Sequence, residues 1–144
     1  MEQLSKSAVQ AARDLRVFFS RLRRRMREVA TDDDLTPSQT AVLTRLWKEG
    51  SSSTSALATA ERVRPQSMAA TVAALDQHRL IHRAPDPEDG RRQVISLTTA
   101  GRHRAENDRQ LRGEWLARAM QDRYSERERH VILDALSLLE RLPQ

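Results

Sequence analysis

The chain has 144 residues, a length typical of one domain with a sizeable buried core. It contains no cysteine, which excludes disulfides, thiolate zinc sites and redox sensing through a thiol. The formal net charge of +5 favours a polyanionic partner such as nucleic acid. All but two of the basic residues are Arg, so the base composition of the source genome could produce the same excess.

Residues 4–29 predict one long helix with an apolar seam, because apolar side chains recur there at alternating steps of three and four. A seam of this length predicts packing on other helices, either of a second copy of the chain or of the same subunit. The basic run RLRRRMRE is interpreted as a solvent-exposed helix face, since the seam passes through it. The seam consists of Leu4, Ala8, Ala11, Leu15, Phe18, Leu22, Met26 and Val29.

The segment TDDDL interrupts this helix, and capping signals then predict the start of the next one. Thr36 is expected at the N-cap, Pro37 in the first turn and Gln39 in the capping-box position. Gly50 is expected to end the helix.

Two short helices are expected next, joined by a tight turn. Ser53 or Thr54 can cap the first of them. The second is expected to begin at Pro65, to turn Met68, Val72 and Leu75 inward, and to run to about Arg79. This arrangement is typical of a helix-turn-helix.

Two strands follow, at 80–84 and 93–97, with the turn PDPEDG between them. Thr98 and Ser125 are expected to cap two further helices, the second with a full capping box. The fold class is therefore mainly α with a small β-hairpin wing: a winged helix-turn-helix with long N- and C-terminal dimerisation helices. The last helix carries one apolar face, formed by Val131, Ile132, Ala135, Leu136, Leu139 and Leu142.

Polar side chains at the starts of the two short helices are candidates for DNA contacts. A helix fits the major groove, and its N-terminal side chains reach base edges. Helix N-termini also attract phosphate. The alternative is that these residues are ordinary caps and surface polar groups. The base-reading candidates are Arg64, Gln66, Ser67 and Thr71, and the backbone-contact candidates are Ser53, Thr54 and Ser55.

The hairpin tip supplies a candidate for the minor groove. Arg91 follows Gly90, which permits a tight bend, and an Arg at this position can enter the narrow groove where negative potential is concentrated. Asp89, two residues earlier, is expected to pair with Arg91 and hold it extended. The alternative is a charged turn that only keeps the hairpin soluble.

These segments resemble the MarR family of transcriptional regulators over essentially the whole chain. DPEDGRRQVISLTTAG is similar to the family's wing signature, D-x-R followed by alternating apolar residues and L-T-x-x-G. LTPSQTAVLTRL, STSALATAERV and VRPQSMAATVAALDQHRLI are similar to its second, third and recognition helices. The resemblance implies a homodimer that binds a pseudo-palindromic operator, usually as a repressor, and that dimerises through its first and last helices.

The chain departs from the family pattern at four positions. Ala70 replaces a residue that is often polar or basic, which suggests different base reading there. Arg62 and Arg79 occupy places often held by Gly, so these turns are expected to be strained or differently shaped. Arg92 is often small in relatives, and here it adds an expected phosphate contact.

The expected organisation is a single MarR-like domain over residues 1–144, with dimerisation helices at 1–34 and 111–144 and the DNA-binding region at 35–110. No enzyme is expected, because no catalytic constellation or glycine-rich phosphate loop is present. No metal site and no cofactor are expected, because His78 and His82 lack further residues at ligand spacing. No apolar run is long enough to cross a membrane and no signal peptide is evident, so a cytoplasmic location is expected.

The expected function is that of a sequence-specific, DNA-binding transcriptional regulator, a repressor whose partners are double-stranded DNA and a second copy of the chain. The family often binds small aromatic or amphipathic compounds, so the resemblance leaves open whether such a ligand releases the DNA, and ligand-binding residues are unknown. Phe18, Phe19, Trp47 and Trp115 could line a ligand space, but core packing is favoured for them. The alternatives are a ligand-independent architectural DNA-binding protein and a helical protein-interaction module that has lost DNA binding.

Overall fold

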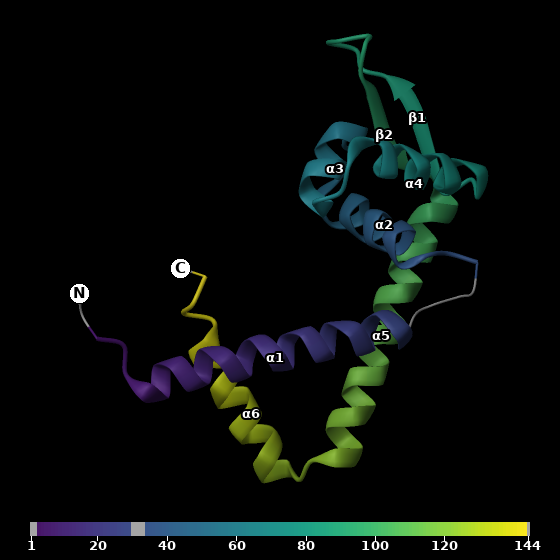
Figure 1. The fold of residues 1–144 in the computed structure, drawn as a ribbon. Helices are drawn as coiled ribbons and strands as arrows, with labels where there is room; N and C mark the ends of the chain where they lie inside the picture. The colour runs from purple at the N-terminus through teal and green to yellow at the C-terminus, as the bar shows by residue number, and fades with distance from the viewer. Residues whose placement is uncertain (1–2, 30–33, 144) are drawn as a thin grey trace.

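The computed structural model describes residues 3–29 and 34–143. These residues form six helices and a two-stranded antiparallel hairpin, a winged helix-turn-helix with long helical arms (Figure 1). Thr31, Asp32 and Asp33 of the expected break lie outside the described residues. The elements are α1 (Lys6–Val29), α2 (Pro37–Glu49), α3 (Thr54–Glu61), α4 (Pro65–Gln77), β1 (Ile81–Pro85), β2 (Gln93–Leu97), α5 (Thr99–Arg123) and α6 (Glu126–Leu139).

The helix ends follow the capping signals of the sequence. The side chain of Thr36 accepts a hydrogen bond from the amide of Gln39, and Gln39 accepts one from the amide of Thr36, at 3.2 and 3.1 Å. Gly50 ends α2 with a φ of 87°, a backbone conformation that favours glycine. Ser53 caps α3, and Ser125 forms the expected capping box of α6 with Glu128. Local polar chemistry therefore sets these boundaries.

The end of α4 and the start of β1 differ slightly from expectation. The helix ends at Gln77, and Arg79 adopts a left-handed conformation with a φ of 59°. Leu80 lies in the connection instead of the strand, because its amide donates to Leu75 O and its carbonyl accepts from the amide of Thr98. The strand therefore occupies Ile81–Pro85, one residue later than expected, and pairs in register with β2.

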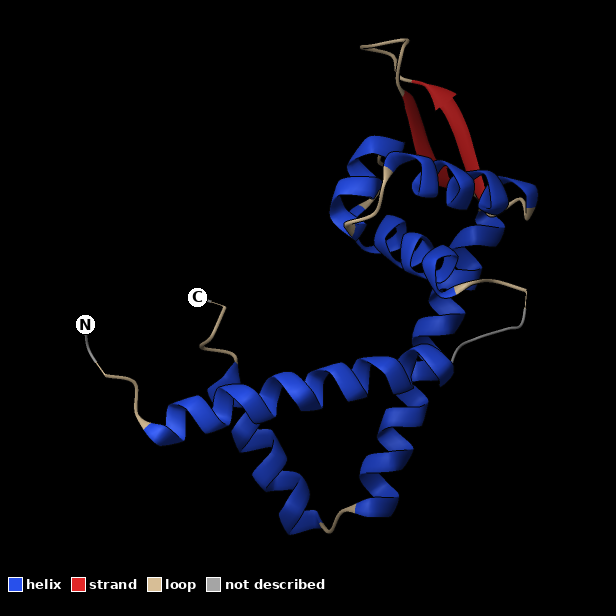
Figure 2. Cartoon of the chain, in the orientation of Figure 1, coloured by secondary structure: helices blue, strands red, loops and turns tan. Residues whose placement is uncertain are grey.

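One contiguous core lies beneath α2, α3, α4 and the hairpin, and we call this part of the molecule the head. Its members come from all four segments, and most of them are less than 4% exposed. The outward-facing half of the hairpin projects from the head into solvent (Figure 2). The core consists of Leu35, Val42, Leu43, Leu46, Leu57, Ala58, Met68, Val72, Leu75, Leu80, Ile81 and Ile95.

Gly101 shows why the L-T-x-x-G segment has a glycine where α5 leaves the head. A Cβ built on Gly101 would lie 1.9 Å from the carbonyl oxygen of Leu80, a backbone atom that cannot give way easily. Thr98 fixes this approach, since its hydroxyl accepts from the amide of Gly101 and donates to Arg79 O at 2.8 Å. The segment thus joins the hairpin, the end of α4 and the start of α5.

The remaining helices, which we call the arms, are α1, α6 and the distal half of α5. Neither α1 nor α6 contains a buried residue. The boundary expected at residue 110 or 111 falls inside α5, which runs unbroken from the head into the arms (Figure 1). Arg112 ties α1 to α5 by donating to Met26 O at 3.1 Å.

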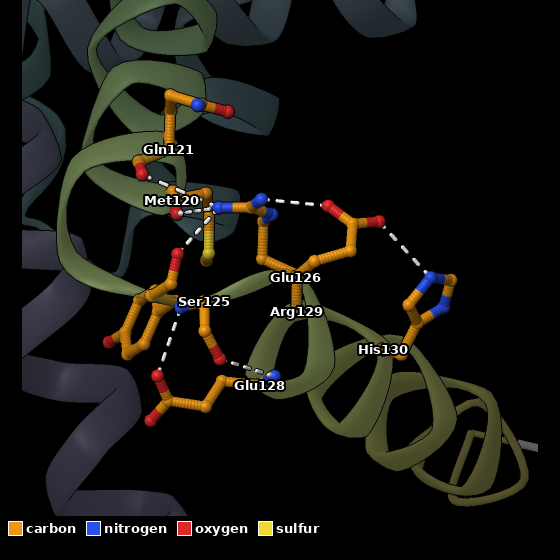
Figure 3. Close-up of polar contacts among 8 residues, drawn as sticks. Met120, Gln121, Ser125, Glu126, Glu128, Arg129 and His130 are labelled. Carbon is orange, nitrogen blue, oxygen red and sulfur yellow. Dashed lines mark hydrogen bonds and ion pairs between the residues drawn. The ribbon is translucent and has the colours of Figure 1, made fainter.

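The corner between α5 and α6 is held by Arg129 (Figure 3). Its guanidinium donates to three carbonyls at the end of α5, the shortest bond being to Tyr124 O at 2.5 Å, and pairs with the Glu126 carboxylate at 2.7 Å. Hydrogen bonding to Arg129 lowers the pKa of Glu126, and the Ser125 amide lowers that of Glu128. A cation at a helix C-terminus also complements the helix dipole.

Candidate nucleic-acid interface

The start of α3 is positioned by the hairpin. Ser52 and Ile95 exchange two backbone hydrogen bonds, of 3.0 and 2.7 Å, so the segment before α3 lies beside β2 as a short bridge. The hydroxyl of Ser53 then accepts from the amide of Ala56 at 3.2 Å and caps the helix. Ser53 and Thr54 are half-buried and Ser55 is exposed. All three expected backbone-contact residues thus stand at the N-terminus of an ordered helix.

The start of α4 presents the expected base-reading residues. Arg64 is the N-cap residue and makes no side-chain capping bond, and Pro65 occupies the first turn. The side chains of Arg64, Gln66 and Ser67 are exposed. Thr71 is half-buried, and its hydroxyl donates to Ser67 O at 3.1 Å. Thr71 therefore retains acceptor capacity, whereas Gln66 offers both a donor and an acceptor.

Carboxylates organise the tip of the wing through the backbone. Asp86 accepts from the amide of Glu88 at 2.9 Å, and Asp89 accepts from the amide of Arg91 at 3.1 Å. Backbone bonds between Asp86 and Arg92 and between Arg92 and Asp89 close the turn. Asp89 therefore fixes the main chain of Arg91; within the described residues no ion pair joins the two side chains. The guanidinium of Arg91 is exposed to solvent.

Arg92 has a different environment from its neighbour. Its guanidinium donates to the hydroxyl of Ser53 at 2.8 Å, across 39 residues of sequence. The structure thus brings together two residues that the sequence placed in separate candidate groups.

Two ion pairs that sequence reasoning missed join separate elements of the head. Arg83 of β1 donates to the Asp76 carboxylate of α4, with its Nε 3.0 Å away. Arg45 of α2 donates to Glu61 at the end of α3, at 2.8 Å, and this bond raises the pKa of Arg45. No helical spacing in the sequence indicates either pair, because the two residues of each pair lie on different elements.

The turns at Arg62 and Arg79 are left-handed, with φ values of 56° and 59°. This confirms the expectation of strained turns at these two positions, which relatives often fill with glycine. A non-glycine side chain in this region carries a strain of about 1 kcal/mol.

A cleft of about 460 Å³ lies between α1, α2 and α5 beside the head. Four aromatic residues were expected to pack in a core, and of these only Phe19 lines the cleft. Phe18 and Phe19 are each 59% exposed in the single chain, so the expectation of core packing is wrong for both. The guanidinium of Arg109 lies over the ring of Trp47, with its Cζ 4.7 Å from the ring centroid, and that of Arg25 lies over the ring of Trp115 at 5.5 Å. The walls of the cleft carry five basic and two acidic side chains: Arg23, Arg27, Arg45, Lys48, Arg112, Glu49 and Glu61.

Within residues 3–29 and 34–143, no group of three metal-ligating side chains is present. His78 is the C-cap residue of α4 and His82 belongs to β1, and both are exposed. No helix of the described chain is long and apolar enough to span a bilayer.

A helix-turn-helix whose second helix is followed at once by a two-stranded wing defines a winged helix-turn-helix protein, a class that binds DNA. Comparison with known proteins agrees, since a family model described as "MarR family" matches residues 35–92. The chain belongs to the MarR family and is a DNA-binding transcriptional regulator.

The named relatives support this assignment over nearly the full length. An HTH-type transcriptional regulator of Mycobacterium tuberculosis is 35% identical over 133 residues, covering 92% of each chain. A crystal structure of a transcriptional regulator from Pseudomonas aeruginosa is 36% identical, covers 98% of each chain and superposes with a TM-score of 0.83. Wild-type MarR of E. coli, 20% identical with a TM-score of 0.76 over 96% of this chain and 98% of its own, shares the fold.

Proposed function

We propose that two copies of the chain bind a pseudo-palindromic operator and repress transcription from it. In each copy, Arg64, Gln66, Ser67 and Thr71 would contact the major groove and Arg91 the minor groove. Ser53, Thr54 and Ser55 would contact the phosphate backbone of the DNA between these two grooves. The two recognition helices would lie about one helical turn of DNA, roughly 34 Å, apart.

The observation that carries this proposal is the construction of the head. The start of α4 exposes a cation and two neutral polar side chains, which suit base edges and phosphates. The wing is joined to the start of α3 by the Ser52–Ile95 pairing, and Arg91 at its tip is exposed. An exposed Arg on a projecting hairpin suits the negative potential of a narrow minor groove.

Dimerisation is supported by the arms. Their helices expose large apolar side chains and bury none of them, and an apolar surface of this kind is unfavourable in water. A symmetric second copy would cover both helices at once. The exposed apolar residues of α1 and α6 and their flanks include Leu4, Val9, Val17, Val131, Leu133, Leu136, Leu138 and Leu142.

The DNA upstream of the coding sequence is the first target to test, by footprinting for a protected inverted repeat. Arg91→Ala should weaken binding by about 1–3 kcal/mol and reduce the salt slope by about one, because one phosphate-region contact is lost. Arg118→Ala, which removes the same charge from an exposed position on α5, is the matched control and should leave specific binding nearly unchanged. Equal binding by wild type and Arg91→Ala, with the dimer folded, would exclude the wing contact, whereas a folded wild-type protein that binds no DNA would favour a protein-interaction module.

Release by a small amphipathic acid is proposed on the basis of the cleft beside the head. Its apolar floor includes Phe19, Leu22 and Met26, and its basic residues suit a carboxylate. Because the cleft lies between arm and head, a ligand that prefers another head spacing would lower DNA affinity by its differential affinity for the two spacings. Aromatic carboxylates should release the footprint from wild type and not from Phe19→Ala. Weak operator preference without release by any compound would favour an architectural DNA-binding protein.

A further inference from the structure

The wing is joined to the helices at three places, one of which is the ion pair between Arg83 of β1 and Asp76 of α4. At the root of the wing, Ser52 and Ile95 exchange their backbone bonds. Nearer the tip, the Arg92 guanidinium donates to the Ser53 hydroxyl at 2.8 Å. Among the hydrogen bonds and ion pairs of the described residues, this is the one contact that joins the turn at 86–92 to a helix.

The backbone of Arg92 closes the turn that carries Arg91. Its amide donates to Asp89 O at 3.0 Å, and its carbonyl accepts from the amide of Asp86 at 2.9 Å. The amide of Arg91 is in turn bonded to the Asp89 carboxylate. A side-chain contact that holds Arg92 therefore holds the whole turn, including the main chain from which Arg91 projects.

We propose that Arg92 is a positioning residue for DNA binding: it braces the wing against the start of α3 and presents Arg91, instead of contacting a phosphate itself. This inference rests on the proposed function. A two-stranded hairpin is only marginally stable by itself, and an unbraced wing would have to lose conformational freedom on binding. The brace removes part of this loss before DNA arrives.

Salt dependence separates the two roles of Arg92. A phosphate contact releases counterions, so its removal reduces the salt slope by about one. Loss of a brace lowers affinity at every salt concentration and leaves the slope unchanged. Arg92→Ala should therefore bind operator about three- to ten-fold more weakly with an unchanged slope, whereas the matched variant Arg91→Ala should lose one unit of slope.

A double variant tests whether Arg92 acts through Arg91. If it does, Arg91→Ala/Arg92→Ala should bind hardly more weakly than Arg91→Ala alone, because the positioned group is already absent. Multiplicative losses, together with a slope reduced by about two, would show two independent phosphate contacts and overturn the proposal.

A distance measurement tests the brace without DNA. Because the chain has no cysteine, spin labels can be placed at Glu88→Cys and Ala60→Cys, both exposed, in dimers diluted with unlabelled chain. The label-to-label distance distribution should broaden in Arg92→Ala and in Ser53→Gly. The second variant removes the hydroxyl that accepts from Arg92, and glycine is acceptable at a helix N-cap. The distribution should stay narrow in Arg91→Ala.

An unchanged distribution in Arg92→Ala would overturn the brace, and a broadened one with unchanged operator affinity would overturn its role in binding. If the wild-type protein bound no operator, the proposed function would fail, yet the distance measurement would still decide whether Arg92 holds the wing.

Discussion

The head and the arms of this protein solve the problem of burial in different ways. The head buries leucine, valine and isoleucine side chains from four segments almost completely within one chain. In α1 and α6 the same residue types stay exposed, with Val17 45% and Leu136 50% exposed. Burial supplies most of the free energy of folding. The head therefore has a core of its own within the single chain, whereas in α1 and α6 the single chain buries no residue.

The largest effect is expected where α5 leaves the head. Gly101→Ala should destabilise the protein by about 3 kcal/mol or more, because the new methyl group would collide with the backbone of Leu80. Denaturant unfolding measures this loss. Gly113→Ala in the arm half of the same helix is the control, since nothing lies within 4 Å of a Cβ there. It should be neutral or stabilise by up to about 1 kcal/mol, because Ala favours helix. Similar effects at the two glycines would contradict the close approach.

The second effect separates the arms from the head. Leu136→Glu should weaken the proposed dimer, since it places a charge on the exposed apolar face of α6. Sedimentation should show monomer at concentrations where wild type is dimeric, while a core substitution such as Leu43→Ala should instead cost about 2–5 kcal/mol in unfolding. Ser137→Glu adds the same charge on the polar side of α6 and should leave association nearly intact. A Leu136→Glu protein as dimeric as wild type would show that α6 is not in the interface.

A smaller effect, of opposite sign, is expected at the left-handed turn between α3 and α4. Arg62→Gly should stabilise the head by about 0.5–1 kcal/mol, because glycine adopts a φ of 56° without steric strain. Thermal unfolding is the measurement. Arg64→Gly, two residues later at a φ of −68°, relieves no such strain and should not stabilise. If both substitutions destabilised equally, Arg62 would be held by a contact that outweighs its strain.

The smallest effect is expected at the α5–α6 corner on acidification. The Ser125 amide lowers the pKa of Glu128, so its contribution to stability is complete above the ordinary carboxyl pKa and is lost as the pH falls through the lowered value. The carboxylate is exposed, so the change should be small. An NMR titration should show the Glu128 pKa rising toward its ordinary value in Ser125→Pro, which removes the amide N–H at a φ of −70° that proline can adopt. An unchanged titration would mean that another group holds Glu128.

Much of the fold follows from local sequence. The helix ends lie where the capping residues of the sequence predict them, because a cap is completed within a few residues. These capping residues are Thr36, Gly50, Ser53, Thr98 and Ser125. The displaced strand at Leu80 could not be foreseen, since its carbonyl is bonded by Thr98 on another element. The DNA contacts themselves remain predictions: the structure shows which of these side chains are exposed, and binding experiments must test their roles.

The sequence alone determined the order of elements, most of their boundaries, the family and the candidate DNA-contacting residues, because periodicity, capping and turn formation act over a few residues. Only the tertiary structure decided which of these residues meet. It paired Arg92 with Ser53 across 39 positions, joined Arg83 to Asp76, and brought Gly101 against Leu80. It also showed that no residue of α1 is fully buried in a single chain. Such pairings depend on how separate elements pack, and no local sequence pattern shows which residues of distant segments will come into contact.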